Sequence, residues 1–517
     1  MSRRAGIRGG RVSPFRKGAF RESGLRLLAV GLLSLASVPQ VAADPCDPFR
    51  YRELASPPVV RDADSFLLAV EREGIPPSFL LGAFHSADPR VRERWEPVGL
   101  LFATGGVRLM VTERAEDPPV SGADDPRLLP PGASGLQTQM EGLGLGERFA
   151  TEAAGHGIGA ALFDRLRPWV AAALIEQGPA RDHPESGRIL DDVLRTEARA
   201  LGVPLQPLET MDSLAAEQDR TLGPDDQRAL LAAAVCNAAA SARLVAEQTD
   251  AYVANDPRRF HEAMARLGGA DPELEARVMA GLVEARNERF WQLLAPEFAK
   301  GGVLAAVGNL HVLGTGGLAR RLADAGFKVT ALDPDRLRVS LHAAQVPALV
   351  RWVAEWAGRE EGVPDAGFAG VTIEPRSAVS LRRLRCPGQR CRIDGTYLPG
   401  EQRILLESGV YARLLAGGAA PQPVFRNGAL ALSDTRAPGV QDNATAYAES
   451  ILVRELVRHA LHGKTGAGNE ASGHGVTASC RESGILHRAS LAQAAYLRDR
   501  GAGVQAHIFP LDPRCAP

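Results

Sequence analysis

The sequence predicts an α/β fold: a mixed sheet of two related half-units with a helical insertion between them, followed by a smaller α+β C-terminal domain. Two observations support this prediction. An apolar run, a histidine, a helical stretch and a second apolar run occur in this order twice, over residues 78–113 and 301–333. The residues between the two units are rich in Ala and Leu with charged faces, a pattern typical of packed helices.

The first half-unit begins with the apolar run 78–84, which ends in Gly82-Ala83-Phe84 directly before His85. A helix-like stretch over 91–103 follows. Two glycines end that stretch, and a second apolar run over 107–111 leads to Glu113. This order predicts a strand, a helix and a strand, with a histidine after the first strand and an acid after the second.

The second half-unit repeats the layout. Its apolar run 303–307 ends in Gly308-Asn309-Leu310 before His311. A Gly-rich segment then enters a helix that Gly326 closes, and a second apolar run over 327–332 leads to Asp333. Ligands collect at the carboxyl ends of the strands in an open parallel sheet, so the two histidines mark the expected site.

The remaining elements are assigned by hydrophobic period. Between the half-units we expect a strand over 203–208 that leads to Glu209, and helices over 158–177, 187–201, 225–251 and 282–294. A further helix is expected over 64–73. After Asp333 the pattern indicates a helix over 338–356, short strands over 370–373, 391–397 and 402–406, and one strong helix over 443–462.

These observations divide the 517 residues into four parts. We predict a signal peptide over 1–43, a first domain over 44–340, a linker region over 341–365 and a C-terminal domain over 366–517. The net charge of −1, with evenly mixed signs, gives no electrostatic case for nucleic acid or an anionic membrane.

The N-terminus predicts export. Arginines precede an apolar segment over 25–36, and Val41-Ala42-Ala43 suits cleavage after Ala43. The apolar segment is shorter than the ~20 residues that a membrane span needs. We therefore expect an exported protein, periplasmic or secreted, without a stable membrane span after cleavage.

All six cysteines lie in the mature chain, and an even number in an exported protein predicts disulfides. The favoured pairs are Cys386 with Cys391, as a local loop closure, and Cys480 with Cys515, as a tie for the C-terminal tail. None of the cysteines has the doubled C-x-x-C spacing of a structural zinc site.

The candidate chemistry lies at the strand ends. His85 and His311 each stand three residues after a glycine at the end of an apolar run. A lone histidine there is usually a capping or packing residue, but a pair favours a metal or catalytic site, because glycine leaves the imidazole unobstructed. With Glu113 and Glu209, two imidazoles and two carboxylates at one sheet edge suit a divalent cation with water positions left open.

An ordered set of motifs over about residues 50–335 resembles the TraB/GumN family, which is related to the Tiki metalloproteases. The set consists of Gly82-Ala83-Phe84-His85, Glu113, Leu208-Glu209-Thr210, Arg286-Asn287, Gly308-Asn309-Leu310-His311 and the Gly-rich helix that leads to Phe327-Lys328-Val329. The resemblance implies an α/β core with a helical insertion and, in the Tiki branch, a metal-dependent peptidase.

Carried over by position, the resemblance implies that His85 and His311 are metal ligands. It makes Glu113 and Glu209 a ligand and a general base, in an order that the sequence leaves open. Arg286 and Asn287 would orient the substrate or hold the acids. The expected reaction is metal-assisted hydrolysis of a peptide or protein substrate, with manganese, cobalt or zinc as the cation.

Two other functions remain open. The first is a non-catalytic periplasmic binding or assembly factor that uses the same fold and cleft. The second is a dinucleotide-binding protein, because Gly314-Thr315-Gly316 with Ala319 and Asp333 imitates the G-x-G-x-x-A fingerprint and its ribose-binding acid. The fit is flawed, since residues 309–313 separate the strand from these glycines.

The C-terminal region resembles a zinc metallopeptidase that has lost its ligands. Residues 450–463 read SILVRELVRHALHG, in which Arg454-Glu455-Leu456-Val457-Arg458 stands where H-E-x-x-H is expected. Arginine stays protonated and cannot coordinate zinc, so we predict a degenerate zincin-like domain with guanidinium groups at the former cation position. A downstream helix over 488–497 would place Arg488 where the third ligand is expected.

A second interpretation of this helix is an ordinary amphipathic core helix. It would turn Ile451, Leu452, Leu456 and Leu461 inward and its charged residues toward solvent. In either case His459 and His462, three residues apart, are expected to be ordinary helix residues.

Overall fold

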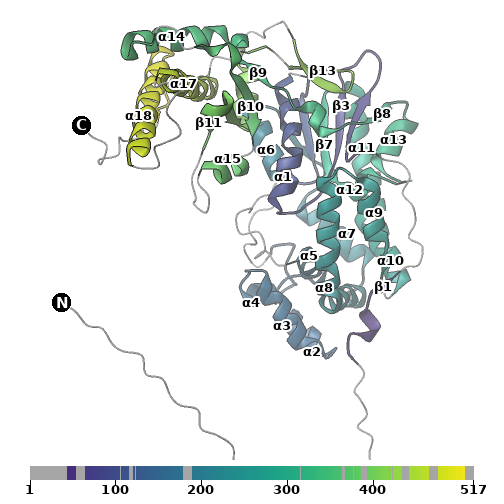
Figure 1. Ribbon diagram of the computed structural model, residues 1–517. Coiled ribbons are helices and arrows are strands. Elements are labelled where there is room, and N and C mark those ends of the chain that lie inside the picture. Colours follow the sequence, from purple (N-terminus) through teal and green to yellow (C-terminus); the bar gives the residue numbers. More distant parts are fainter. Residues whose placement is uncertain are drawn as a thin grey trace, which may run out of the picture. The chain divides into compact units, whose positions relative to one another are not determined.

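The computed structural model describes residues 44–506, apart from 54–63, 105, 116–119, 121, 123, 179–188, 270, 315, 364–366, 377, 386–392, 419, 422, 434–441 and 465–475. The predicted signal peptide lies outside the described residues. Helices and mixed sheets alternate along the chain, which confirms the predicted α/β class (Figure 1).

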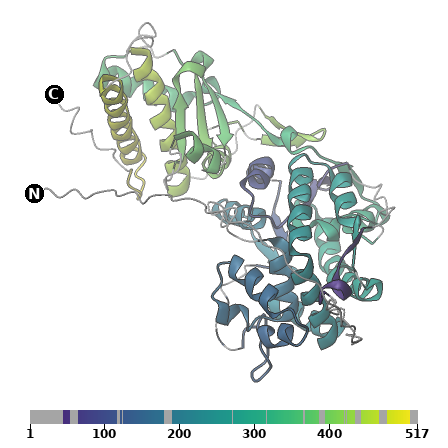
Figure 2. The same ribbon diagram turned by 60° about the horizontal axis from the view of Figure 1, so that its bottom comes forward.

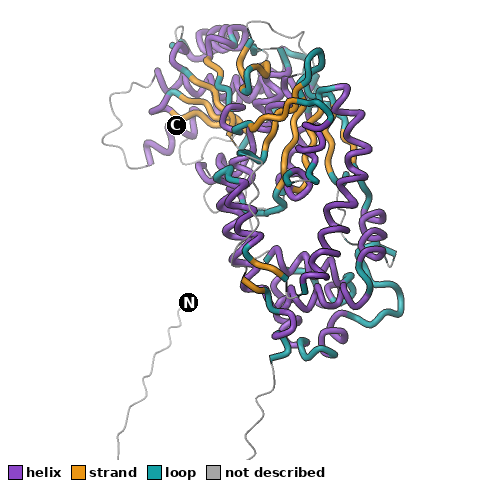
Figure 3. The backbone as a smooth tube through the Cα atoms, turned by 90° about the vertical axis from the view of Figure 1, so that its right-hand side faces the viewer, coloured by secondary structure: helices purple, strands orange, loops and turns teal. Residues whose placement is uncertain are grey.

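A six-stranded sheet forms the centre of the first region. Its strands, in the order β5-β4-β7-β3-β2-β8, are β5 (Leu205–Pro207), β4 (Leu109–Thr112), β7 (Val303–Gly308), β3 (Ser78–Ala83), β2 (Leu67–Glu71) and β8 (Lys328–Ala331). Strands β3, β7, β4 and β5 are parallel, whereas β2 runs antiparallel to both of its neighbours. Figure 3 shows the strands side by side in orange.

The order of the strands explains how the two half-units meet. Strand β7 of the second unit lies between β3 and β4 of the first unit, with Leu81 opposite Ala306 and Val111 opposite Ala305. The carboxyl ends of β3, β7, β4 and β5 therefore lie at one edge of the sheet. His85, Glu113, Glu209 and His311 each follow one of these four strands, whereas Asp333 follows β8.

Helices cover both faces of the sheet. One face packs against α1 (Pro89–Trp95), the 3-10 helix η2 (Glu96–Thr104), α6 (Leu190–Ala200) and the end of α8. The other face packs against α11 (Ala285–Lys300), the short α12 (Asn309–Val312) and α13 (Leu318–Asp324). In β7, Leu304 and Ala306 face the first layer and Val303 and Ala305 face the second, as expected for a strand buried on both sides.

Four local predictions differ from the structure. The helix expected over 158–177 is two helices, Ala160–Phe163 and Pro168–Gln177, and the helix expected over 338–356 is Pro347–Glu361, preceded by a strand at Leu341–His342. The helix expected over 64–73 is strand β2, because its continuous apolar run is buried between β3 and β8; short apolar runs do not distinguish a buried strand from a helix. The helix expected over 91–103 divides into α1 and η2. Pro97 follows the end of α1 and has no N–H to continue the α-helical ladder.

The insertion between β4 and β7 is helical, with β5 passing through it. Its helices are α2 (Leu136–Glu141), α3 (Gly146–Gly155), α4 (Ala160–Phe163), α5 (Pro168–Gln177), α6, α7 (Met211–Thr221), α8 (Pro224–Val253), α9 (Pro257–Ala265), α10 (Pro272–Met279) and α11, with a π-helical turn over Ala280–Glu284. The two-residue strands β1 (Arg52–Glu53) and β6 (Leu267–Gly268) pair beside it.

Helix α8 is long and apolar enough, by length and composition, to cross a membrane. Core helices of soluble proteins pass the same test, and α8 packs against α5 and α9. Its Leu231, Ala232 and Val235 are buried in a helical core. Its Cys236 forms a disulfide with Cys46, a pair that we did not anticipate. Both of the expected pairs involve residues or side chains outside the described set.

The C-terminal region contains a four-stranded sheet in the order β11-β12-β10-β9 (Figure 2). The strands are β9 (Leu341–His342), β10 (Thr372–Arg376), β11 (Gly395–Leu398) and β12 (Arg403–Glu407), and β11 is an edge strand. The helices are α14 (Pro347–Glu361), α15 (Ala378–Arg385), α16 (Ser408–Ala416), α17 (Asn443–Lys464) and α18 (Val476–Asp499), and a hairpin joins β13 (Pro423–Arg426) to β14 (Ala429–Leu432).

Candidate functional site

The strand-end residues meet around Gly308, the last residue of β7. His85 follows β3, Glu113 follows β4, and His311 lies in α12 directly after β7. A Cβ atom built on Gly308 would lie 2.9 Å from Glu113 Oε1, 3.6 Å from His311 Cδ2 and 3.9 Å from His85 Cε1. A side chain at this position would clash with Glu113 Oε1, whereas its distances to the two histidines would be ordinary van der Waals contacts.

Arg286 joins the two glutamates. It follows a π-helical turn at the start of α11, a distortion that occurs often at functional sites, and its Nη1 donates to the Leu282 carbonyl at 3.0 Å. Its Nη2 donates to Glu113 Oε2 at 2.6 Å, and its Nε donates to Glu209 Oε2 at 3.0 Å. The same Nη2 also donates to Glu209 Oε1, so both oxygens of Glu209 accept from one guanidinium.

The three charged groups are buried together, with 6% of Arg286, and 7% each of Glu113 and Glu209, exposed. Burial alone would raise the pKa of Glu113, but Arg286 and the two histidines lower it far below its ordinary value. Gly308 N also donates to Glu113 Oε1 at 2.5 Å. Glu113 is therefore a carboxylate over the physiological pH range.

Asn287 holds His311 in one orientation. Its Nδ2 donates to the Gly316 carbonyl at 3.1 Å, which directs its Oδ1 toward His311 Nδ1 at 2.8 Å. A carbonyl oxygen cannot donate, so Nδ1 carries the proton and Nε2 of the neutral ring is an acceptor. Burial lowers the pKa of His311 to about 4, against the attraction of Glu113.

His311 Nε2 lies 3.8 Å from Glu113 Oε1. In the neutral histidine both atoms are acceptors, and two acceptors at this distance repel unless a donor or a cation stands between them. This arrangement suits a cation by its donor chemistry. Glu209 differs, because Arg286 occupies both of its oxygens.

His85 pairs with Asp191, a residue at the start of α6. His85 Nε2 lies 3.6 Å from Asp191 Oδ1. Burial would lower the pKa of His85, but Asp191 and Glu113 raise it to about 9. Because 35% of the His85 side chain is exposed, water screens part of this attraction.

A cavity of about 20 Å³ opens beside His85 and Glu113 and is lined also by Arg114, Ile189, Asp191 and Arg195. A space of this size holds one water molecule or one small ion. Asp191 and Arg195 belong to the site but were missed in the sequence. The acids in the first turn of α6 do not belong to any sequence motif that would have linked them to the strand ends.

The predicted ligands are therefore brought to one place, but not as a finished ligand set. Among the described residues, no group of three His, Cys, Asp or Glu side chains is arranged to hold a metal ion. Glu113 and His311 face each other and His85 is adjacent, which fits a cation by donor type. Glu209 and Arg286 instead form an ion pair that holds Glu113.

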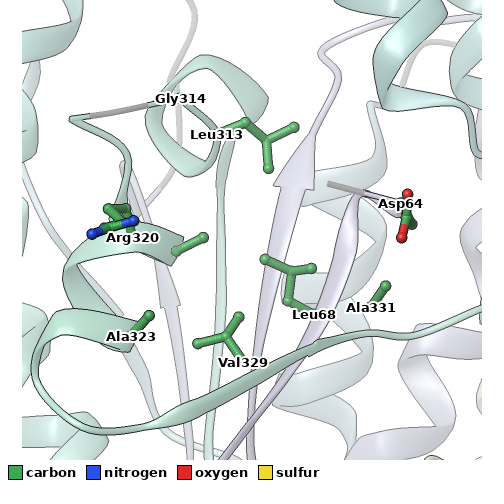
Figure 4. Close-up of a pocket in the computed structure, with 9 residues that line it drawn as sticks. Asp64, Leu68, Leu313, Gly314, Arg320, Ala323, Val329 and Ala331 are labelled. Atoms are coloured by element: carbon green, nitrogen blue, oxygen red, sulfur yellow. The ribbon is translucent and has the colours of Figure 1, made fainter. Parts of the chain in front are cut away.

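The Gly-rich segment after His311 lies beside a different cavity, of about 300 Å³ (Figure 4). It is lined by Leu68 of β2, Leu313 directly after α12, Ala323 of α13 and Val329 of β8, with Arg320 at its side. The dinucleotide interpretation gains no support here. Asp333 accepts from Asp335 N and pairs with Arg94 at 3.0 Å, so its carboxylate caps the 3-10 helix over Pro334–Leu337.

One of three comparisons with known proteins identified a family. The family model of the TraB/PrgY/gumN family matches residues 66–331, which is more than half of the chain. The match begins just before β2, ends with β8 and contains His85, Glu113, Glu209, Arg286 and His311. Neither the curated proteins nor the solved structures gave a match. The chain belongs to the TraB/PrgY/gumN family.

Proposed function

We propose that the protein is an exported hydrolase whose reaction centre is the cluster of His85, Glu113 and His311, and that this cluster holds a divalent cation. One observation carries the proposal. Two imidazoles and one carboxylate, which follow three different strands, all lie within 4 Å of the Cβ position of Gly308.

His311 Nε2, Glu113 Oε1 and His85 Nε2 are the atoms that would hold the cation. A cation bound there supplies Lewis acidity toward a water molecule or a substrate carbonyl oxygen. The cavity beside His85 has room for the one water molecule that hydrolysis requires. Manganese, cobalt and zinc all suit a site with mixed nitrogen and oxygen donors.

The remaining residues prepare these atoms. Arg286 donates to Glu113 Oε2, which turns Oε1 toward Gly308 and His311. Asn287 fixes the proton of His311 on Nδ1, as a hydrogen-bonded partner does for many ligating histidines. Asp191 stabilises a proton on His85 while no cation is bound, and His85 must release that proton before its Nε2 can hold the cation.

Export and substrate class are part of the proposal. The arginine-rich leader and its apolar segment support export, and so does the Cys46–Cys236 disulfide, because such bonds persist in oxidising compartments. The substrate class that we propose is a peptide or protein, and it rests on the resemblance to the Tiki metalloproteases.

Metal analysis of the purified mature protein tests the site. We expect one manganese, cobalt or zinc ion per chain after equilibration with each metal, and peptidase activity with at least one of them. His85→Ala with His311→Ala should remove both the bound metal and the activity. His342→Ala is the control, because this exposed histidine lies in the C-terminal region. A metal content that stays unchanged in the double variant would overturn the proposal.

A non-catalytic binding or assembly factor is the second candidate. The ion pairs of Arg286 with both glutamates favour it, because they compensate the buried carboxylates without an added cation. A mature protein that binds none of the three metals and cleaves no peptide, yet unfolds cooperatively, would support this candidate.

A further inference from the structure

We propose that the R-E-x-x-R segment of α17, together with Glu482 of α18, is a former metal centre in which two guanidinium groups have replaced the cation. It is separate from the histidine cluster and involves Arg454, Glu455 and Arg458. The C-terminal region is then held by ion pairs in the place where a zinc peptidase holds its metal.

The geometry places two positive groups around one buried carboxylate. Glu455 is 0% exposed. Its Oε1 accepts from Arg454 Nε at 2.7 Å and its Oε2 accepts from Arg458 Nη1 at 2.8 Å. Two arginines four residues apart on one helix face would repel each other, and Glu455 between them offsets that repulsion. The helix also buries Ile451, Leu452, Leu456 and Leu461, as predicted for its core face.

A third group completes the pattern. Glu482 of α18 accepts from Arg458 Nη2 at 2.6 Å and lies 3.1 Å from His462 Nε2. In H-E-x-x-H enzymes two histidines, at i and i+4 on a helix, and a glutamate from elsewhere form a His₂Glu zinc site. Arg454 and Arg458 occupy the two histidine positions, and Glu482 supplies an acid from the adjacent helix.

The acid was expected at a different position. Arg488, which the sequence places at the third-ligand position, instead pairs with Glu361 of α14 at 2.8 Å. The downstream helix predicted over 488–497 lies within α18, but the residue of α18 that faces α17 at this point is Glu482.

Two guanidinium groups, those of Arg454 and of Arg385 in α15, also donate to the free edge of β11. Asp394 O accepts from Glu407 N of β12, so by strand alternation the carbonyls of Gly395 and Tyr397 point away from β12. The Gly395 carbonyl accepts from Arg454 Nη2 at 3.2 Å, and the Tyr397 carbonyl accepts from Arg385 Nη2 at 2.6 Å. An extended peptide pairs with such carbonyls when it adds to a sheet, so this edge is closed to that binding mode.

Restoring the histidines tests the inference. In the full-length mature chain carrying His85→Ala and His311→Ala, Arg454→His with Arg458→His should create a zinc site. After chelator treatment and equilibration with zinc, we expect one additional zinc ion per chain relative to the parent. Adding Glu482→Gln should weaken that binding about tenfold or more. The control is Arg454→Gln with Arg458→Gln, which removes both guanidinium groups without adding imidazoles and should bind no additional zinc.

The chain with Arg454→His and Arg458→His, called the histidine variant below, can be tested whether or not it folds without metal. A folded histidine variant with no additional zinc would overturn the inference. If the histidine variant unfolds without metal, zinc should restore cooperative unfolding and magnesium should not, because the donors are those of a zinc site. No recovery with zinc, or equal recovery with magnesium, would overturn the inference.

Discussion

At the scale of single residues, the site depends on how Arg286 shares its donors. One guanidinium satisfies both oxygens of Glu209 and one oxygen of Glu113, which leaves the other oxygen of Glu113 toward His311. Buried charges of this kind contribute little net stability as a set, but removing one partner is costly. Arg286 is therefore a residue whose loss affects both folding and the site.

The first prediction concerns Arg286→Met. Two buried carboxylates lose their shared counter-ion, and we expect the free energy of unfolding to fall by about 3–5 kcal/mol. Chemical denaturation at neutral pH measures the change. Adding Glu113→Gln and Glu209→Gln to Arg286→Met should recover part of the loss. If the single variant were as stable as the parent, the ion pairs would not hold this region together.

The second prediction concerns the tautomer of His311. Asn287→Asp replaces an acceptor amide oxygen with a carboxylate, which should raise the pKa of His311 above its low value of about 4. Because the folded protein binds a proton at His311 less tightly than the unfolded chain does, the free energy of unfolding decreases as the pH falls from 6.5, the ordinary pKa, toward 4.

NMR titration of the His311 ring measures this effect. We expect the midpoint to move upward in Asn287→Asp and to stay nearly unchanged in Asn255→Asp, because Asn255 contacts Ser65 and Phe66 instead. A His311 midpoint that does not move in Asn287→Asp would mean that Asn287 does not set its protonation.

At the scale of elements, the end of β7 limits what can occupy the site. The third prediction is that Gly308→Ala disrupts the cluster, because the added Cβ would lie 2.9 Å from Glu113 Oε1. The backbone at Gly308 has φ −49°, which an alanine can adopt without strain. We expect metal affinity to fall at least tenfold, because displaced partners cost about 10–100-fold in comparable sites. Isothermal titration with manganese or zinc measures the affinity.

Gly316→Ala is the matched control, because a Cβ there would meet no atom within 4 Å. Equal loss in both variants would point to a general effect on the segment after β7. Metal binding by Gly308→Ala at parental affinity would contradict the site assignment.

The sequence predicts which residues form strands and helices better than it predicts which strands pair with each other. Apolar runs before His85 and His311 become β3 and β7, because each strand is buried on both faces. The same property misled the prediction at 64–73, where an equally apolar run is β2. The pairing of β8 with β2 could not be predicted either, because the hydrophobic period does not show which strands pair with each other.

The candidate site follows the same division. His85, Glu113 and His311 could be predicted because each follows a strand whose end is marked by a local pattern. Asp191 could not, because only the tertiary packing of α6 brings it to His85. The role of Glu482 could not be predicted either, because only the packing of α18 against α17 brings it to Arg458.

At the scale of the whole molecule, a set of buried acids links the region around the six-stranded sheet to the C-terminal sheet. Glu96 of η2 and Glu197 of α6 are buried, and within the described residues Glu96 Oε1 and Glu197 Oε2 have no hydrogen-bond partner. Burial, together with the charge of Glu407 at the end of β12, raises the pKa of Glu96 to about 8, although Arg338 lowers it. Burial and the same Glu407 raise the pKa of Glu197.

The fourth prediction follows from the sign of the Glu96 shift. The folded state holds the proton more tightly than the unfolded chain, so stability declines as the pH rises from about 4.5 to about 8. Glu96→Gln should stabilise the protein by about 1–3 kcal/mol at pH 8 and leave it nearly unchanged at pH 5. Thermal unfolding at both pH values measures this, with the exposed Glu73→Gln as control. An equal effect at both pH values would exclude titration of Glu96 as the cause.

The fifth prediction concerns the disulfide. Cys46 and Cys236 are separated by 190 residues, so their bond restricts a large part of the unfolded chain. Cys46→Ser with Cys236→Ser should lower the free energy of unfolding by about 2–4 kcal/mol. Denaturation of the double variant measures the loss. Reducing agent should have little further effect on this variant if the bond accounts for the redox sensitivity of the parent.

Helix α8 connects that disulfide to the candidate site. Its Cys236 is bonded to Cys46, and its Tyr252, sixteen residues later, donates to the Gly82 carbonyl at 2.9 Å, three residues before His85. The helix between them spans about 24 Å at 1.5 Å per residue. One helix therefore carries both a covalent attachment to Cys46 and a hydrogen bond to the strand that leads to His85.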